Sequence, residues 1–509
     1  MNRKLALTVV VIALAWYALL GLRHPARPGL HYDECRFAAA PIAAGGIAMQ
    51  SPGVGKIKSW LMQPLLGSAA TPASIRAPMV LVGLIALVFT ALLAFRFFGP
   101  RESALVTVLL AFDPFLLHHV REDWGPSALG LLLRVTTLLL VLSFTKNGRG
   151  HTLLAAAFVA GLGVWNTADF LFFLIPLIIA AAIWLRTPLR DTTQKSLWFA
   201  IVAFFVGASP ALLYWLTYRD LTALSLQTGS NDFSATALAY KAAAIFDTLR
   251  GTYPVRTFLG ETSITTKRTL LPHVLIAGAF VLAWLRCKTK TPVWRDNTAA
   301  FLATLLGSQL LLLLLVPHAY GSHHFFTLTP TAHLLAAVML IAFLDHAFKS
   351  KAAKRAATAL LLAPILLIGL VASVDVEAVL DDRGGAGAWS PAIADLADIA
   401  QQHPDARFVF LDWGMTTQLL TLNGRFEYDE IFRALATDSP GENALQKLDE
   451  RLRDDSVVFV AHGENKTVFA QPMQHLLDRM AALNLSFNWI ETINDTDGKT
   501  LFHLFRATP

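Results

Sequence analysis

Long apolar segments, repeated along most of the chain, constrain its fold more than any other feature. A helix that crosses a bilayer needs about 20 predominantly apolar residues, with a range of roughly 17 to 25. Segments of about this length and character lie at residues 5–22, 78–98, 103–118, 126–145, 152–168, 169–186, 197–217, 270–286, 298–316, 325–345 and 356–374. Because lipid offers the backbone no hydrogen bonds, each crossing segment is expected to be helical. The sequence predicts an α-helical polytopic membrane protein with about 11 transmembrane helices.

The composition agrees with a membrane protein. Only 15% of the 509 residues are charged, whereas soluble domains carry about 25%, and the mean hydropathy is +0.51. The net charge of +6 comes from basic residues scattered in short loops, which does not indicate nucleic acid binding. The first apolar segment follows Arg3 and Lys4 and has no small-residue cleavage site after it. We therefore expect an uncleaved first helix.

Basic residues fill every second loop, which predicts the orientation of the bundle. These loops hold Arg3, Lys4, Arg96, Arg101, Lys146, Arg149, Arg186, Arg190, Lys195, Arg286, Lys288, Lys290, Arg295, Lys349, Lys351, Lys354 and Arg355. The short loops of the other side hold Arg121 alone. Since short cytoplasmic loops carry the excess of Lys and Arg, we expect a cytoplasmic N-terminus and an extracytoplasmic C-terminus. The expected location is the cytoplasmic (inner) membrane.

Two long outer loops and a polar tail complete the chain. Residues 23–77 contain an expected interfacial helix at 57–66, and residues 218–269 are expected to form helices on the membrane surface. A flexible linker begins at Asp381, which divides the chain into a transmembrane domain, 1–380, and an extracytoplasmic α/β domain, 381–509. The tail has predicted strands at 407–411, 457–461 and 500–505 and predicted helices at 415–422, 443–453 and 471–483.

Ionisable side chains gather in the outer loops. The first loop holds Asp33, Glu34, Arg36, Lys56 and Lys58; the loop after the third segment holds His118, His119, Arg121, Glu122 and Asp123; the loop before the tenth segment holds His318, Tyr320, His323 and His324. Charges at a membrane edge are costly and therefore favour a functional hypothesis.

These groups suit the transfer of a sugar from a lipid phosphate or pyrophosphate carrier. The acceptor hydroxyl must give its proton to a carboxylate, and the leaving phosphate needs cations or a divalent metal. Asp33 is the candidate general base, and Glu34 beside it is the second catalytic candidate. The candidates for substrate binding are Arg36, Lys56 and Lys58 for the phosphate, Glu122 and Asp123 for sugar hydroxyls or a metal, and Arg121, His323 and His324. The sequence leaves the cofactor unknown, with a divalent metal as the one option.

Each group also has a structural interpretation. The acidic pair could solvate a loop, and the basic residues could contact lipid headgroups. Glu122 and Asp123 could cap the fourth segment, with Trp124 in an aromatic belt. The histidines could be interfacial, and adjacent histidines on a helix point apart, which is a poor metal pattern. Asp113-Pro114 indicates a helix break rather than a buried charge, and Asp412-Trp413-Gly414 is typical of a turn.

Short motifs in these places resemble the membrane glycosyltransferases of the GT-C fold. They are the acidic pair followed by Arg and an aromatic residue in 31–38, the Arg of 74–78 at the start of the second segment, and the second-loop residues 111–114 and 121–123. The resemblance covers roughly residues 1–345 and is strongest to protein O-mannosyltransferases and lipid A aminoarabinose transferases. It implies inverting transfer from a polyprenyl-phosphate sugar with Asp33 catalytic, and a metal in some members only.

The chain departs from that family in two places. Relatives carry Arg-Tyr where this chain has His323-His324-Phe325, and a Lys-Pro-Pro-Leu stretch is missing near Lys56 and Lys58. We expect a GT-C glycosyltransferase whose partners are a polyprenyl-phosphate-linked sugar donor, a cell-envelope acceptor (glycan, lipid or protein) and membrane lipids, without nucleic acid. The alternatives are a lipid-linked sugar transporter or flippase, which should show repeats and mid-membrane charges, and a non-catalytic membrane assembly protein.

Overall fold

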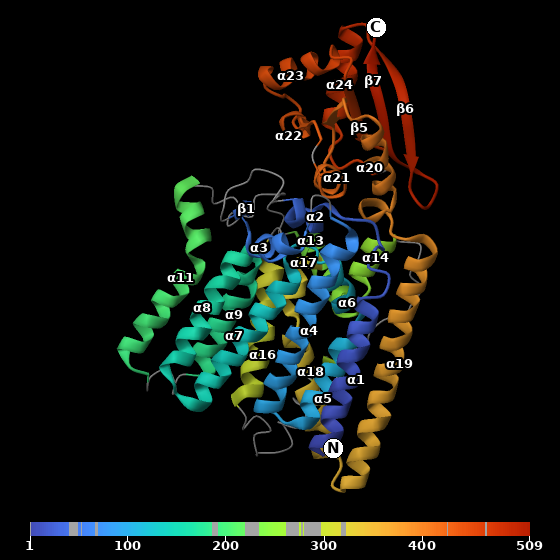
Figure 1. The fold of residues 1–509 in the computed structure, drawn as a ribbon. Coiled ribbons are helices and arrows are strands. Elements are labelled where there is room, and N and C mark those ends of the chain that lie inside the picture. The colour runs from blue at the N-terminus through green and yellow to red at the C-terminus, as the bar shows by residue number, and fades with distance from the viewer. Residues whose placement is uncertain are drawn as a thin grey trace.

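The structure, a computed structural model, describes residues 2–39, 49–51, 53–66, 70–185, 192–218, 234–260, 274–275, 278, 297–316, 322–424, 426–463 and 466–509. Its lower part in Figure 1 is a helical bundle. The bundle helices are α1 (Arg3–Gly21), α4 (Pro72–Phe97), α5 (Pro100–Ala111), α6 (Pro114–Arg121), α7 (Ser127–Asn147), α8 (Gly150–Asn166), α9 (Leu171–Trp184), α11 (Gln194–Tyr218), α16 (Asn297–Leu315), α18 (Thr331–Ala347) and α19 (Lys351–Arg383).

Five described helices are long and apolar enough to cross a membrane, or six if the bent pair α5 and α6 counts as one span. Three shorter apolar helices lie beside them, at 168–184, 299–315 and 331–347. The predicted segment 270–286 falls almost entirely outside the described residues. The helical membrane bundle is therefore clear, and the number of about 11 spans remains a prediction.

The third span is broken where the sequence predicted a break, but the charge there is buried. The axes of α5 and α6 differ by 63°, because Pro114 cannot continue the helical hydrogen bonds and Asp113 caps the new helix through Phe115 N. The prediction that a break replaces a buried charge was wrong. Asp113 is only 3% exposed, and its Oδ2 lies 3.0 Å from Nε2 of His333 on α18. A buried partner makes a carboxylate tolerable at this depth.

Short helices cover one end of the bundle (Figure 1). They are α2 (Tyr32–Ala39), α3 (Ile57–Met62), α13 (Ala235–Leu249), α14 (Tyr253–Leu259) and α17 (Ser322–Phe325), with the 3₁₀ turns η1 (Gln63–Leu65), η2 (Ala168–Phe170) and η3 (Phe326–Leu328) and the strands β1 (Met49–Ser51) and β2 (Val54–Gly55). Loops far apart in sequence therefore meet at this end, which we call the loop face.

A mixed sheet follows α19. Its strands are β3 (Arg407–Phe410), β4 (Tyr428–Glu430), β5 (Val457–His462), β6 (Ser486–Asn494) and β7 (Thr500–Thr508), in the order β4-β3-β5-β7-β6. The pairs β3–β4 and β3–β5 are parallel, and β5–β7 and β6–β7 are antiparallel. The turn and helices around it are η4 (Gly387–Trp389), α20 (Ala392–Gln402), α21 (Thr416–Asn423), α22 (Phe432–Leu435), α23 (Glu442–Leu452) and α24 (Gln471–Ala482).

Both faces of this sheet are packed. Alternate residues of β3 divide between two clusters, with Phe408 and Phe410 in one and Val409 in the other. That division follows the two-residue period of a strand. The structure adds β4, β6, α20 and α22 to the elements that we predicted from the sequence.

The tail packs against the first loop. Thr417 and Thr421 of α21 donate hydrogen bonds to the carbonyls of Tyr32 (3.0 Å) and Cys35 (3.4 Å). Gly29 N donates to Trp389 O (2.8 Å). A Cβ at position 29 would lie 2.0 Å from Ser390 O, so only glycine fits there. The C-terminal residues therefore help to position the helix that carries Asp33 and Glu34.

Candidate functional site

Asp33 lies in the first turn of α2, on the loop face, and is the more accessible of the two first-loop acids. An acidic side chain is favourable at a helix N-terminus. The side chain of Asp33 is 27% exposed, and its Oδ2 accepts a hydrogen bond from Trp124 Nε1 at 2.9 Å. Nδ1 of His31 accepts from Asp33 N (3.1 Å), and burial lowers the pKa of His31. His31 Nδ1 also lies 3.8 Å from Asp33 Oδ2, and no Lys or Arg comes within ion-pair distance of that carboxylate among the described residues.

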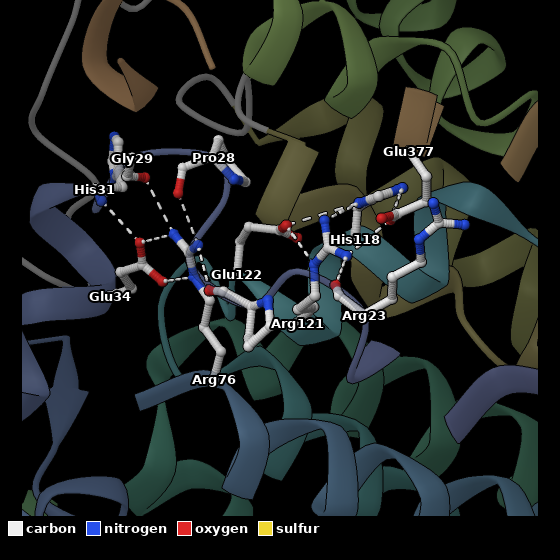
Figure 2. A network of polar contacts seen from close by, with 11 residues as sticks. Arg23, Pro28, Gly29, His31, Glu34, Arg76, His118, Arg121, Glu122 and Glu377 are labelled. Carbon is white, nitrogen blue, oxygen red and sulfur yellow. Dashed lines mark hydrogen bonds and ion pairs between the residues drawn. The ribbon is translucent and has the colours of Figure 1, made fainter. Parts of the chain in front are cut away.

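Glu34, one residue on, is completely enclosed. Its two oxygens meet Arg76 of α4, with Nε–Oε2 at 2.9 Å and Nη2–Oε1 at 2.6 Å, and both side chains have no exposed surface. Figure 2 shows that the remaining donors of Arg76 reach the carbonyls of Pro28 and Gly29, and a further bond goes to Pro25 O. All five guanidinium donors are thus used. This geometry ties the first loop to α4.

Arg121 and Glu122 form a second enclosed network (Figure 2). Arg121 donates to Glu122 Oε1 (2.8 Å) and to Oε1 of Glu377 on α19 (2.7 Å), and its Nη2 lies 3.2 Å from His118 Nδ1. Burial raises the pKa of Glu122, but the charge of Arg121, the hydrogen bond and charge of His118 and the charge of Arg76 together outweigh it and lower that pKa to about 2. His118 and His119 are fully buried, so their interpretation as interfacial polar residues was wrong. The network joins α6 to α19.

Lys58 is also occupied within the protein. Its Nζ lies 2.6 Å from Asp123 Oδ2 and 4.5 Å from the centroid of the Phe37 ring. The other carboxylate oxygen of Asp123 accepts from Ala128 N (2.7 Å) in the first turn of α7. Asp123 therefore satisfies a backbone N–H in the first turn of α7, although the N-cap residue itself is Pro126 and makes no side-chain capping bond. Lys58 holds this loop against α2, which leaves it poorly placed to bind a phosphate.

Of the first-loop cations predicted to bind the phosphate, Arg36 and Lys56 have no such carboxylate partner among the described residues. Arg36 is half-buried and Lys56 is buried. Neither has an ion pair within the part of the chain that the structure describes.

Trp124 lies in a cluster of rings on the loop face and not in an interfacial belt. Its ring centroid is 5.4 Å from His31, 5.2 Å from His323 and 5.9 Å from Trp389. Trp389 from the tail stacks on His31 at 4.3 Å, with 16° between the ring planes. Phe258 of α14 meets Trp389 edge-on at 4.5 Å. Four separate loops therefore surround the indole that contacts Asp33.

His323 and His324 form a compact donor set with Asp169. His324 Nδ1 lies 2.9 Å from Asp169 Oδ2, and one donor atom from each of the three residues lies within 4.8 Å of the others. The two rings are 4.0 Å apart, so the expectation that neighbouring histidines point apart was wrong here. Burial, and next the His324 charge, lower the pKa of His323 to about 4.

This set could hold a divalent cation. Neutral imidazole and carboxylate are ordinary zinc ligands. Nδ1 of His323 is buried and has no hydrogen-bond partner among the described residues. This nitrogen is therefore available to coordinate a metal ion. Asp169 lies in η2, three residues after the end of α8, and the sequence indicated only a connecting loop there; its charge between two apolar segments was the available signal.

Arg134 is a further group that the sequence analysis missed. It lies inside the apolar helix α7 and is buried. Its Nη2 donates to Phe326 O (3.2 Å), and its guanidinium lies 5.3 Å from the Phe326 ring centroid. No carboxylate comes within ion-pair distance in the described ranges. A lone cation in an apolar segment is expensive, and that was the signal available at residues 126–145.

The bundle, the acidic first loop and the tail define a protein with the fold of the GT-C membrane glycosyltransferases, as the sequence motifs predicted. Residues 53–215 match the family described as dolichyl-phosphate-mannose-protein mannosyltransferase. The chain is similar to ArnT from Cupriavidus metallidurans bound to undecaprenyl phosphate, with 15% identity, a TM-score of 0.58, and coverage of 99% of this chain and 98% of ArnT.

A second similar structure is the Archaeoglobus fulgidus oligosaccharyltransferase in its apo form. It has 15% identity, a TM-score of 0.53, and coverage of 90% of this chain and 69% of the other. The archaeal oligosaccharyltransferase AglB from Archaeoglobus fulgidus, in complex with an inhibitory peptide and a dolichol-phosphate, matches with 12% identity, a TM-score of 0.53, and coverage of 90% of this chain and 69% of AglB. No curated protein sequence matches the chain significantly. At such identities the comparisons define the fold, while the reaction depends on the site.

Proposed function

We propose that this protein transfers a sugar from a polyprenyl-phosphate carrier to an acceptor on the outer side of the cytoplasmic membrane. The observation that carries the proposal is the contrast between two adjacent acids. Glu34 is neutralised by Arg76 and enclosed, whereas Asp33 is partly exposed, has no Lys or Arg partner among the described residues and is oriented by Trp124. Structures similar to this chain contain undecaprenyl phosphate or a dolichol-phosphate, which supports a donor of this class.

In this proposal Asp33 is the general base. The acceptor oxygen attacks the anomeric carbon while its proton passes to Oδ1 or Oδ2 of Asp33. The bond from the anomeric carbon to the phosphate oxygen breaks, and its electron pair leaves with the lipid phosphate. Attack opposite the leaving group inverts the anomeric centre. Trp124 keeps the carboxylate in one orientation through its 2.9 Å hydrogen bond.

Cations on the loop face would stabilise the departing phosphate. Arg36 and Lys56 remain candidates from the first loop, and Arg134 joins them as a buried guanidinium with no carboxylate partner in the described part of the chain. A divalent cation held by Asp169, His323 and His324 would supply further positive charge. Lys58 and Arg121 already form ion pairs with Asp123 and Glu377. We therefore assign them structural roles in place of substrate binding.

The covering elements would determine the acceptor. Helices α13 and α14 come from the predicted outer loop 218–269, and Phe258 of α14 contacts Trp389. The tail reaches the first loop through Trp389 and through Trp413, whose ring centroid lies 4.7 Å from that of Tyr32. An acceptor approaching Asp33 would therefore meet surfaces from both. We propose that these elements help to select it.

Mass spectrometry of lipids and envelope glycans, in cells with and without the gene, tests the proposal. We expect one species to differ by the mass of one sugar. Cells that carry only Asp33→Asn should match cells without the gene, while the exposed tail variant Asp382→Asn should match the wild type. Normal sugar transfer by Asp33→Asn at equal protein abundance would refute the assignment. A carrier-linked sugar whose sidedness changes without any new acceptor product would favour the transporter alternative.

A further inference from the structure

A cavity lies at the opposite end of the bundle from Asp33. Its volume is about 720 Å³, and it is lined by residues of α1, α5, α18 and α19. Figure 1 shows the N-terminus beside the lower end of α19, at the far end from the tail. By the distribution of Lys and Arg, this is the predicted cytoplasmic end. The cavity is remote from the loop face and independent of the proposed sugar transfer.

The mouth of the cavity is strongly positive. Four basic side chains line it: Arg101, Lys351, Lys354 and Arg355. Arg101 and Lys354 share the carboxylate of Asp345. Lys351 and Arg355 have no carboxylate partner within the described residues, and they lie four positions apart on one side of α19. Asp345 forms ion pairs with two of these four cations, and the charge of Glu102 also acts on Arg101.

Three helices also begin at this mouth. The first residues of α1, α5 and α19 are Arg3, Pro100 and Lys351. Asn2, just before α1, is part of the lining. Each helix N-terminus adds a partial positive charge and first-turn backbone N–H groups, of which Leu5 N and Ala353 N are already capped by Asn2 and Ser350. A phosphate would be favoured at such a place both by the side chains and by the helix ends.

Away from the mouth, the lining becomes apolar. It includes Leu5 and Val9 of α1, Leu105 and Val108 of α5, and Ile341 of α18. From Asn2 to Val9 the cavity wall extends about 10 Å along the helix, at about 1.5 Å per residue. Leu5 is 53% exposed on the bundle surface, where a bilayer would surround it. A hydrocarbon chain could therefore lie along α1 without leaving the membrane.

We propose that this cavity binds an anionic phospholipid of the adjacent leaflet. Its phosphate would lie among Arg101, Lys351 and Arg355, and an acyl chain would run along the apolar residues of α1, α5 and α18 that line the cavity. The apolar wall selects a lipid over a free phosphate, and the basic mouth selects an anionic headgroup over a zwitterionic one. Basic pockets between transmembrane helices commonly bind such headgroups. The lipid would fasten α19, and with it the tail, to the bundle.

Native mass spectrometry of the detergent-purified full chain tests this inference. The probes are phosphatidylglycerol and phosphatidylcholine with the same acyl chains, and glycerol 3-phosphate as the headgroup without the chains. We expect the wild type to bind phosphatidylglycerol most tightly. The variant Lys351→Gln/Arg355→Gln should lose roughly tenfold or more in affinity for it, since each basic residue near a surface contributes about 1 kcal/mol, or about fivefold. Thermal unfolding of each variant should show that it remains folded.

The matched control is Lys146→Gln/Arg149→Gln, which removes the same charge from another basic loop that does not line the cavity. This control should bind phosphatidylglycerol like the wild type. Three results would overturn the inference: equal binding of both lipids by the wild type, an equal loss of affinity in the control, or competition by glycerol 3-phosphate as strong as that of the lipid.

Discussion

Replacing Glu34 with Gln separates the roles of the two neighbouring acids. The variant keeps the shape of the side chain but removes the charge that faces Arg76. Two of the five Arg76 donors go to Glu34, and the other three go to backbone carbonyls. Those carbonyl bonds remain, but no counter-charge replaces the carboxylate, and both side chains are fully buried.

Breaking a buried pair from one side costs about 3–5 kcal/mol. We expect Glu34→Gln to lower the free energy of unfolding by about that amount, measured by denaturant titration in mixed micelles. Asp33→Asn is the matched control, since it is the same chemical change one residue away on a partly exposed side chain. It should change the free energy of unfolding by less than about 1 kcal/mol.

The double variant Glu34→Gln/Arg76→Met should be less destabilised than the sum of its two single variants, because no unpaired buried charge remains. Sugar transfer should be affected in the opposite order from stability. Asp33→Asn should abolish it, and Glu34→Gln should retain it in proportion to the amount of folded protein. Equal unfolding free energies for Glu34→Gln and Asp33→Asn would refute the reasoning. The reasoning would also be refuted if the loss of unfolding free energy in the double variant equalled the sum of the losses in the two single variants.

Three further predictions follow from the site. Trp124→Phe removes the hydrogen bond to Asp33, so kcat should fall about tenfold or more with KM for the donor little changed; an unaltered kcat would contradict an orienting role. Trp389→Ala removes the ring that stacks on His31 and should destabilise the protein by about 3–5 kcal/mol, seen as faster amide hydrogen exchange in α2, which Trp489→Ala on exposed β6 should leave unchanged. Adding Zn²⁺ to chelator-treated protein should raise the unfolding temperature of the wild type but not of Asp169→Ala; equal responses would exclude this donor set.

Much of the bundle was predictable because the membrane imposes a local rule. Apolar runs at 5–22, 78–98 and 126–145 correspond to α1, α4 and α7, within several residues at each end. Backbone hydrogen bonds in lipid must be satisfied within the segment itself, so a segment's own residues suffice to predict a helix. The tail strands were predicted in part, because β6 exposes most of its residues and its hydropathy pattern is weak.

The sequence alone determined the class of this protein: its apolar segments, the acidic pair shortly after the first of them and the motifs that resemble GT-C glycosyltransferases are all readable locally. The tertiary structure decided which charged side chains are paired within the protein and which remain available to a substrate. Arg121 meets Glu377 from a helix 256 residues away, and Lys58 meets Asp123 from another loop. A charge is free to act on a substrate only if no neighbour neutralises it, and its neighbours depend on how distant segments pack. For that reason Asp33 and Glu34, adjacent in the sequence, differ in the fold.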